Sequence, residues 1–313
     1  MRRVMVLLML LPTLSGCLTL AGARRPDDVV RGRTALHRMT VEGVRRSYLL
    51  TVPAASGASR PGPVPLVLAF HGHRGSGGLL QYASGLDAAA QRKGWAVAYL
   101  NGTGPLRLAG LGWNATTCCG DAQAENVNDI GFVHALIDTL ARRGMIDSTR
   151  VFATGFSAGG MLALRLACEQ RPVVRAVADV AGAMPDTTCT ARRRLPVLLV
   201  RGDQDLELVA DHAAHRKRNN HRFATSFPGA QRFWARHNGC SDGLTIDSTP
   251  LLVTIASEAC APGALVEQVI IQGVAHEWPG GRTLNRLWPH RPKPVNGAAL
   301  VLEFFERAVG VAR

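Results

Sequence analysis

The chain has 313 residues, of which 47% are hydrophobic and 19% are charged. This composition is typical of a globular protein and excludes the fibrous and disordered classes. Lys and Arg outnumber Asp and Glu by 36 to 23, which gives a formal net charge of +13. No basic run is interleaved with aromatic residues as a base-stacking platform would be, so we predict no nucleic-acid partner.

Residues 1–17 have the pattern of an export signal. Two arginines precede an apolar stretch at residues 4–14, which is shorter than the roughly 20 residues of a membrane-spanning helix. The stretch ends in Leu-Ser-Gly-Cys, which resembles the bacterial lipobox, where the cysteine is acylated. We therefore expect an exported cell-envelope lipoprotein, anchored through Cys17 to the outer membrane of a double-membraned bacterium. The alternative is an ordinary signal peptide and a secreted protein.

For the rest of the chain, the sequence predicts a tether at residues 18–36, followed by a single domain at 37–313. Short apolar runs typical of buried strands occupy residues 46–53, 66–70, 95–100, 150–154, 177–181, 197–200 and 269–272. Stretches with helical character occupy residues 86–92, 129–143, 158–169, 230–238 and 299–309. This alternation predicts an α/β protein with a mostly parallel central sheet and helices on both faces. The chemistry of such sheets lies beyond the carboxyl ends of the strands.

A G-x-S-x-G sequence stands at residues 155–159, directly after the apolar run at 150–154 and before a helix rich in Ala, Leu and Met. This is the context of a nucleophile elbow, a tight strand-to-helix turn that exposes Ser157 at the edge of the sheet. Glycines two residues to either side let the strand and the helix approach closely. The alternative is a glycine-rich turn in which Ser157 only caps the helix.

A serine hydroxyl needs a base to become nucleophilic, and His276 follows the last apolar run on a loop that can reach over the sheet. Asp205 follows the run at 197–200, and Asp203 is a rival acid that spacing alone does not exclude. The chain order Ser, Asp, His is that of α/β-hydrolases. These three residues are therefore candidates for a catalytic triad.

The candidate site also needs oxyanion donors and a substrate pocket. We expect the donors to be the N–H groups of Ala158, at the start of the helix, and of His73, after the run at 66–70. Trp113 and Trp278 are candidate aromatic walls for the acyl group, although either could equally belong to the core.

Metal sites are weakly supported. His71 and His73 could ligate a metal, but neither an H-E-x-x-H sequence nor a third clustered ligand accompanies them. A basic, histidine-rich stretch at 211–221 could bind a metal or an anion, but such stretches are most often solvated loops. We predict no metal.

The cysteines other than Cys17 lie at 118, 119, 168, 189, 240 and 260. Their even number favours disulfides in an exported protein, and the sequence has no pair of C-x-x-C units that would indicate zinc. The sequence by itself leaves the pairing open.

Taken together, these motifs resemble the polyhydroxybutyrate-depolymerase-type esterases, a group that includes feruloyl esterases and bacterial lipoprotein esterases. The matching segments are RSY at 46–48, FHG at 70–72, WN at 113–114, CCG at 118–120, DIGF at 129–132, GFSAGG at 155–160, NGC at 238–240 and HEWPGG at 276–281. The resemblance implies an α/β-hydrolase fold, no cofactor and a triad of Ser157, Asp205 and His276, and thus favours Asp205 over its rival. It also implies a disulfide between Cys240 and Cys260.

The expected reaction is hydrolysis of carboxylic esters through an acyl-enzyme, similar to that of a polyhydroxybutyrate depolymerase. The expected partners are an ester substrate (a polyester oligomer, or an aromatic or acetyl ester) and a membrane, reached through the N-terminal lipid anchor. One alternative is a carbohydrate esterase of the feruloyl or acetyl-xylan type. An alternative of another class is a non-catalytic envelope lipoprotein that keeps the hydrolase scaffold.

Overall fold

A computed structural model describes residues 32–54, 62–106, 110–185, 188–189, 191–205, 227–282 and 295–311. The predicted export signal, Cys17 and the histidine-rich stretch at 211–221 lie outside the described residues. The first strand begins at Thr34, so residues 34–36 belong to the sheet and not to the predicted tether.

Ten strands of the described residues form one sheet, in the order β1-β2-β4-β3-β5-β6-β7-β10-β9-β8. They are β1 (Thr34–Val41), β2 (Val44–Thr51), β3 (Val64–Phe70), β4 (Ala96–Leu100), β5 (Ile146–Phe156), β6 (Ala176–Val180), β7 (Val197–Gly202), β8 (Leu244–Ser248), β9 (Leu252–Ser257) and β10 (Val266–Ile271). The central strands β4, β3, β5, β6, β7 and β10 are parallel, and an antiparallel hairpin flanks them at each end. The parallel core of the sheet agrees with the sequence-based prediction.

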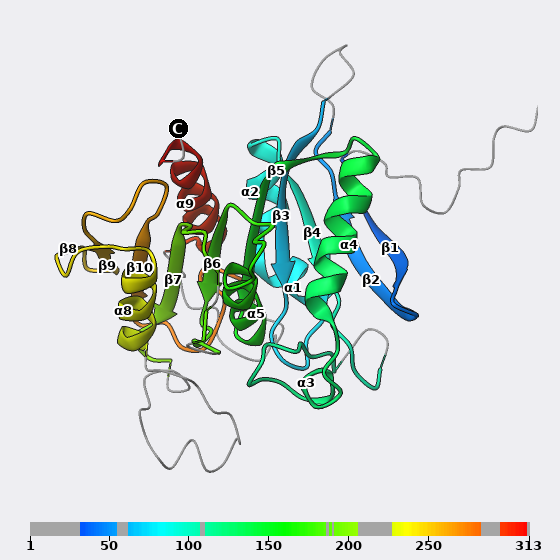
Figure 1. Cartoon of the computed structure of the whole chain (residues 1–313), viewed down its shortest axis with the longest axis horizontal. Helices are drawn as coiled ribbons and strands as arrows, with labels where there is room; N and C mark the ends of the chain where they lie inside the picture. The colour runs from blue at the N-terminus through cyan, green and yellow to red at the C-terminus, as the bar shows by residue number, and fades with distance from the viewer. Residues whose placement is uncertain are drawn as a thin grey trace, which may run out of the picture.

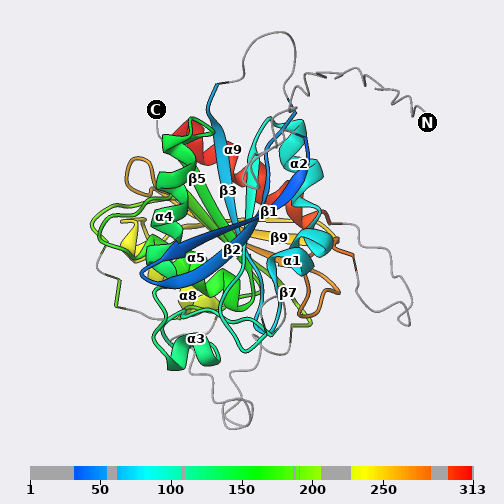
Figure 2. The same ribbon diagram turned by 90° about the vertical axis from the view of Figure 1, so that its right-hand side faces the viewer.

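Helices cover both faces of this sheet (Figures 1 and 2). They are α1 (Gly77–Ser84), α2 (Leu86–Arg92), α3 (Asp121–Ala124), α4 (Asp129–Arg142), α5 (Ala158–Ala167), α8 (Phe227–His237) and α9 (Gly297–Val311). Figure 2 shows α4, α5 and α8 on one side of the sheet and α1, α2 and α9 on the other. Each face is sealed by its own apolar cluster, one containing residues of α4 and α5 and the other containing residues of α2 and α9. Burial on both faces explains why the central strands are continuous apolar runs.

The sequence analysis missed β1, β8, β9, α1 and α3. Strand β9 has the apolar sequence LVTIAS and was overlooked, whereas the others have little apolar signal. Strand β8 is exposed along its whole length, and β1 is an edge strand that pairs only with β2. Helix α1 begins with two glycines, and α3 has only four residues. Their formation depends on partners distant in sequence or on a local cap, such as the Ser76 side chain that accepts the Leu79 N–H of α1.

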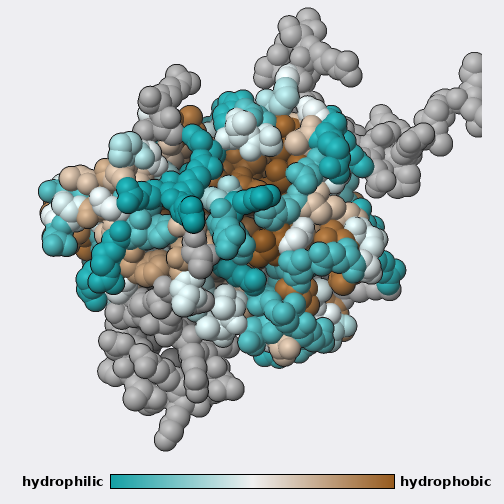
Figure 3. Space-filling view, in the orientation of Figure 1, coloured by the Kyte–Doolittle hydropathy of each residue, from teal (hydrophilic) through white to brown (hydrophobic). Residues whose placement is uncertain are grey.

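The surface of the described residues is mixed. On the face seen in Figure 3, hydrophilic residues separate patches of apolar residues. No helix among the described residues is both long enough and apolar enough to cross a bilayer.

Three disulfides join the six cysteines of the described residues. Cys240 pairs with Cys260, as the family resemblance implied, and ties the end of α8 to the loop after β9. The pairings that the sequence left open are Cys168 with Cys189 and Cys118 with its neighbour Cys119.

A buried ion pair joins the N-terminal hairpin to α4. The Arg46 guanidinium of β2 donates to the Asp129 carboxylate at 2.5 Å, and the two side chains are 2% and 0% exposed. The guanidinium also lies 4.2 Å from the centre of the Phe132 ring. The other Asp129 oxygen accepts the backbone N–H of Asn114 at 2.7 Å. This ion pair therefore joins β2, the start of α4 and the segment at Asn114.

We expect Asp129→Asn to lower the free energy of unfolding by about 3–5 kcal/mol, because it leaves the Arg46 charge buried without a counter-charge. Denaturant unfolding of the purified protein measures this effect. Asp147→Asn is the matched control, because Asp147 pairs with Arg150 in a partly exposed position, and such pairs contribute at most about 1 kcal/mol. Equal losses in the two variants would contradict a structural role for the buried pair.

Candidate active site

The turn between β5 and α5 holds Ser157 in an unusual backbone conformation. Ser157 has φ 54° and ψ −121°, in a region that residues with side chains rarely adopt. A side chain on Gly155 would overlap the backbone of Gly159, and one on Gly159 would overlap the carbonyl of Phe70. The two glycines therefore let α5 begin directly against β5 and β3. Ser157 stands at the edge of the sheet as a result, as the motif predicted.

The structure brings the side chains of Ser157, His276 and Asp205 into one hydrogen-bonded row. The Nε2 atom of His276 lies 3.0 Å from Ser157 Oγ. Its Nδ1 atom lies 2.9 Å from Asp205 Oδ2. Asp205 is fully buried, whereas the His276 side chain is 22% exposed. The carboxylate can thus orient the ring from inside while the ring still meets a ligand.

The rival acid, Asp203, has a different position. It is exposed, and its carboxylate accepts the backbone N–H of Gly273 at 2.7 Å. This hydrogen bond ties the end of β7 to the turn after β10. Asp203 therefore holds the loop that carries the histidine, while Asp205 meets the histidine itself.

The two predicted oxyanion donors are Ala158, directly after the serine, and His73. Ala158 is the first residue of α5, so its N–H has no acceptor within the helix. His73 lies on the loop after β3, and the same cavity borders both His73 and His276. The His73 side chain packs against Gly120, where a Cβ would lie only 2.8 Å from the ring.

The buried ring of His71 holds the loop after β3 in place. His71 Nε2 accepts the N–H of Gly102 at 3.1 Å, so the ring proton is on Nδ1, which donates to the Gly72 carbonyl at 2.8 Å. The ring thereby links the loop after β3 to the loop after β4. Burial lowers the pKa of His71 from 6.5 to about 4, and the ring stays neutral at physiological pH. The sequence analysis considered His71 only as a possible metal ligand.

A cavity of about 300 Å³ opens beside His276. Its apolar lining comes from Leu79, Leu80 and Ala83 of α1, together with Phe156 and Trp278. Trp278 is therefore a wall of the cavity, and it is also part of the apolar cluster on the α2–α9 side of the sheet.

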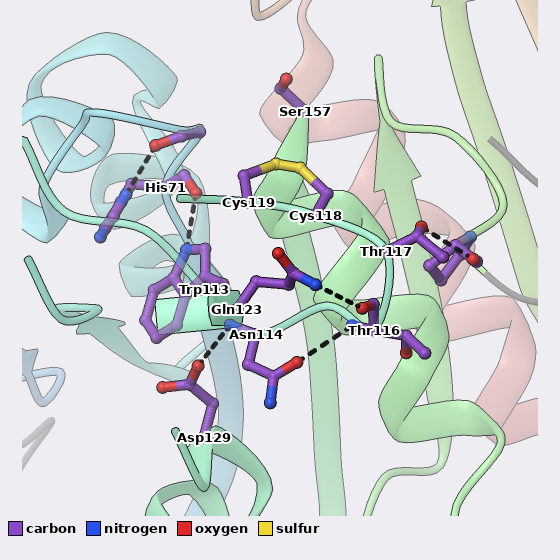
Figure 4. The surroundings of a disulfide bond; sticks show 12 residues. His71, Trp113, Asn114, Thr116, Thr117, Cys118, Cys119, Gln123, Asp129 and Ser157 are labelled. Atoms are coloured by element: carbon purple, nitrogen blue, oxygen red, sulfur yellow. Dashed lines mark hydrogen bonds between the residues drawn. A yellow bond between two sulfur atoms is a disulfide. The ribbon is translucent and has the colours of Figure 1, made fainter. Parts of the chain in front are cut away.

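Trp113 does not line this cavity, and the prediction of a pocket role for it is corrected. Trp113 is fully buried, because its ring packs edge-on against Phe70 and its indole N–H donates to the His71 carbonyl at 2.8 Å. Trp113 thus supports the loop after β3. In the view of Figure 4 the Cys118–Cys119 disulfide lies between Ser157 and Asn114, on the segment that follows Trp113.

The sequence analysis did not identify one buried carboxyl group near the site. Asp179 of β6 is 1% exposed, and it packs so closely on Gly160 and Gly182 that a side chain on either glycine would overlap it. Burial raises the pKa of Asp179 well above its ordinary value, and the negative charge of Asp205 raises it further. A buried carboxyl group with a raised pKa therefore lies under the start of α5. Its position inside an apolar strand gave no signal in the sequence.

The described residues contain no group of three or more His, Cys, Asp or Glu side chains that could hold a metal ion. His71 is buried and His73 is exposed. The chemistry available at the site is that of a serine, an imidazole and a carboxylate.

Comparison with known proteins identifies the family. NocK of Nocardia uniformis subsp. tsuyamanensis, named as a candidate esterase, is 31% identical over 303 residues, which cover 91% of this chain and 84% of NocK. A sequence model of the phospholipase/carboxylesterase family matches residues 119–223, which include the serine elbow and Asp205. The chain belongs to the esterase family of which NocK is a member. It is a carboxylic ester hydrolase.

Two further relatives extend the comparison. Feruloyl esterase B of Piromyces equi is 29% identical over 230 residues, which cover 71% of this chain and 41% of that protein. An acetyl xylan esterase from Aspergillus awamori superimposes with a TM-score of 0.54 at 15% identity, covering 78% of this chain and 95% of that structure. The second similarity establishes the fold alone, the α/β-hydrolase fold that the sequence predicted.

We expect the buried His71 ring to make the free energy of unfolding depend on pH in acid. The folded protein keeps the ring neutral down to about pH 4, whereas the unfolded chain takes up the proton near pH 6.5. Stability should therefore fall as the pH drops from 6.5 towards 4, by up to about 3 kcal/mol from this residue. Denaturant unfolding across this range, compared with His71→Gln, isolates the effect. Parallel pH curves for the two proteins would contradict it.

Proposed function

We propose that the chain is a serine esterase in which Ser157 is the nucleophile, His276 the general base and Asp205 the residue that orients the base. The single observation that supports this proposal is the unbroken row from the carboxylate through the imidazole to the hydroxyl, with separations of 2.9 and 3.0 Å. Both distances are within hydrogen-bonding range in the absence of substrate.

In this mechanism His276 takes the Ser157 proton as Oγ attacks the ester carbonyl. The N–H groups of Ala158 and His73 then stabilise the oxyanion, each contributing about 10²–10³ in rate. The imidazolium gives its proton to the leaving alcohol, and an acyl-enzyme remains. A water molecule, activated by the same imidazole, releases the acid. The buried Asp205 keeps the Nδ1 proton in place throughout.

The acyl group is best placed in the cavity of about 300 Å³, whose apolar walls include Leu80, Phe156 and Trp278. This lining supports medium-length aliphatic or aromatic acyl groups. A feruloyl-type carbohydrate ester is one proposed substrate, supported by the name of the Piromyces equi relative. A hydroxyalkanoate oligomer is the other, supported by the sequence motifs shared with depolymerase-type esterases.

Export and attachment to the cell envelope through Cys17 are further proposals. They depend on the signal-like pattern of residues 1–17.

Ser157→Ala should lower turnover of an activated ester such as p-nitrophenyl butyrate by about a millionfold, because the nucleophile is removed. The same variant should lose covalent labelling by a fluorophosphonate, which reacts with activated serines. Ser148→Ala is the matched control, because Ser148 is an exposed serine in the first half of β5. Normal turnover by the Ser157 variant would contradict the proposed triad. Failure of the native protein to take the label would favour the non-catalytic alternative.

A panel of p-nitrophenyl esters from acetate to octanoate, run beside methyl ferulate and 3-hydroxybutyrate oligomers, tests the acyl cavity. We expect kcat/KM to rise with acyl length until the cavity is filled, since each buried methylene contributes about 0.8 kcal/mol. Activity confined to acetate would contradict the assignment of the cavity to the acyl group. The relative rates on the last two substrates decide between the proposed substrate classes.

A further inference from the structure

A second cavity, of about 240 Å³, lies between the β1–β2 hairpin and the loop after β4. Arg38, Arg45, Arg46 and Ser47 line it from the hairpin, and Thr103 lines it from the loop. This cavity is named the arginine cleft below. The hairpin forms the end of the sheet that faces the reader in Figure 2.

Two arginines share the hairpin face of this cleft. Arg38 pairs with Ser47 across the two strands, and Arg45 pairs with Thr40. Because side chains alternate between the faces of a strand, Arg38 and Arg45 project on the same side as diagonal neighbours, roughly 7–8 Å apart at their Cα atoms. At that spacing, the two guanidinium groups can bind the same anion.

The neighbouring Arg46 shows what distinguishes the cleft arginines. Arg46 also borders the cleft, but its side chain alternates to the opposite face of the strand, where Asp129 neutralises its charge. Within the described part of the chain, neither Arg38 nor Arg45 forms a salt bridge with a carboxylate. Both are exposed. The cleft thus carries two positive charges that no described acid balances.

Hydroxyl donors complete the lining. Ser47 Oγ accepts a hydrogen bond from the Asn101 side-chain amide at 3.0 Å, which leaves its own proton to donate elsewhere. Thr103 Oγ1 is buried and has no hydrogen-bond partner among the described residues. An anion with several oxygen atoms could accept from both hydroxyls as well as from the two arginines.

The cleft adjoins the active site through one pair of residues. Leu111 lines the cleft and forms a β-bridge with Gly75, and Gly75 lines the cavity beside His276. The backbone N–H of Arg74, next to the proposed oxyanion donor His73, also donates to the Leu111 carbonyl at 2.8 Å. A ligand that occupies the acyl cavity and continues past Leu111 therefore meets the arginines.

We propose that the arginine cleft is an anion subsite of this esterase, which selects esters that carry a carboxylate remote from the scissile bond. The inference rests on the proposed function, because it places the ester itself at Ser157. The carboxylate would receive hydrogen bonds from Arg38, Arg45 and the two hydroxyls. Substrates of this class include monoesters of dicarboxylic acids and oligoesters that end in a free acid.

The test compares anionic and neutral esters that share a leaving group. On the acyl side, mono-p-nitrophenyl esters of dicarboxylic acids from succinate to sebacate are compared with the corresponding monoamides. On the alcohol side, para-acetoxybenzoate is compared with para-acetoxybenzamide. We expect kcat/KM to favour the anionic member of at least one pair. An Arg38→Gln/Arg45→Gln double variant should reduce that preference about tenfold through KM, because charge-assisted hydrogen bonds are lost.

The matched control is Arg142→Gln/Arg143→Gln, which removes the same charge from the end of α4, before β5 begins. This control should keep the preference, and both double variants should hydrolyse the neutral esters at the native rate. The preference should also weaken in about 0.5 M salt, because screening acts within a few ångströms at that concentration. The proposed subsite would be overturned by any of three results. These are a native enzyme that shows no preference for anionic esters, an Arg38/Arg45 variant that keeps the preference unchanged, and a control variant that loses it equally. If the native protein hydrolysed none of these esters, the proposed function would be overturned instead.

Discussion

The active site depends on how closely α5 approaches the centre of the sheet. The helix can begin at Ala158 only because Gly155 and Gly159 have no side chains where the two segments meet. That contact forces Ser157 into a left-handed conformation, whose cost of about 1–3 kcal/mol the surrounding packing must offset. In return, the hydroxyl meets His276, and the N–H of Ala158 has no acceptor within the helix. The proposed nucleophile and one proposed oxyanion donor thus come from a single steric constraint.

The loops around the serine are held by buried polar groups rather than by apolar packing. His71 joins the loops after β3 and β4 through its two ring nitrogens, and its carbonyl accepts the indole N–H of Trp113. Asn101 links Ser47 of the hairpin to the first residue of α1. Such groups are costly to bury unless each finds its partner, so the arrangement permits few alternatives. His71 lines the candidate acyl cavity, and Ser47 lines the arginine cleft.

The sequence predicted the parts of the fold that carry their own signal. Each predicted central strand was a mostly apolar run followed within two residues by a glycine, and all seven predicted strands lie in the sheet. Strand β8 was missed because every residue in it is exposed, so it forms only by pairing with β9. Trp113 was misplaced because large aromatic residues serve equally in cores and in pockets. Asp179 was missed because a single acidic residue within an apolar run gives no indication of a role until its neighbours in the fold are known.

By itself, the sequence determined the position of the serine elbow, the alternation of buried strands with helices and the order of the three polar residues at successive strand ends. These follow from local rules, namely side-chain size, period and turn chemistry, which act over a few residues. Only the tertiary structure decided that Asp205, and not Asp203, meets His276, and that Arg38 and Arg45 face one cleft while Arg46 is buried against Asp129. Those outcomes depend on which segments the sheet brings to the same edge. These segments lie tens of residues apart in the sequence, and no local pattern encodes which of them meet.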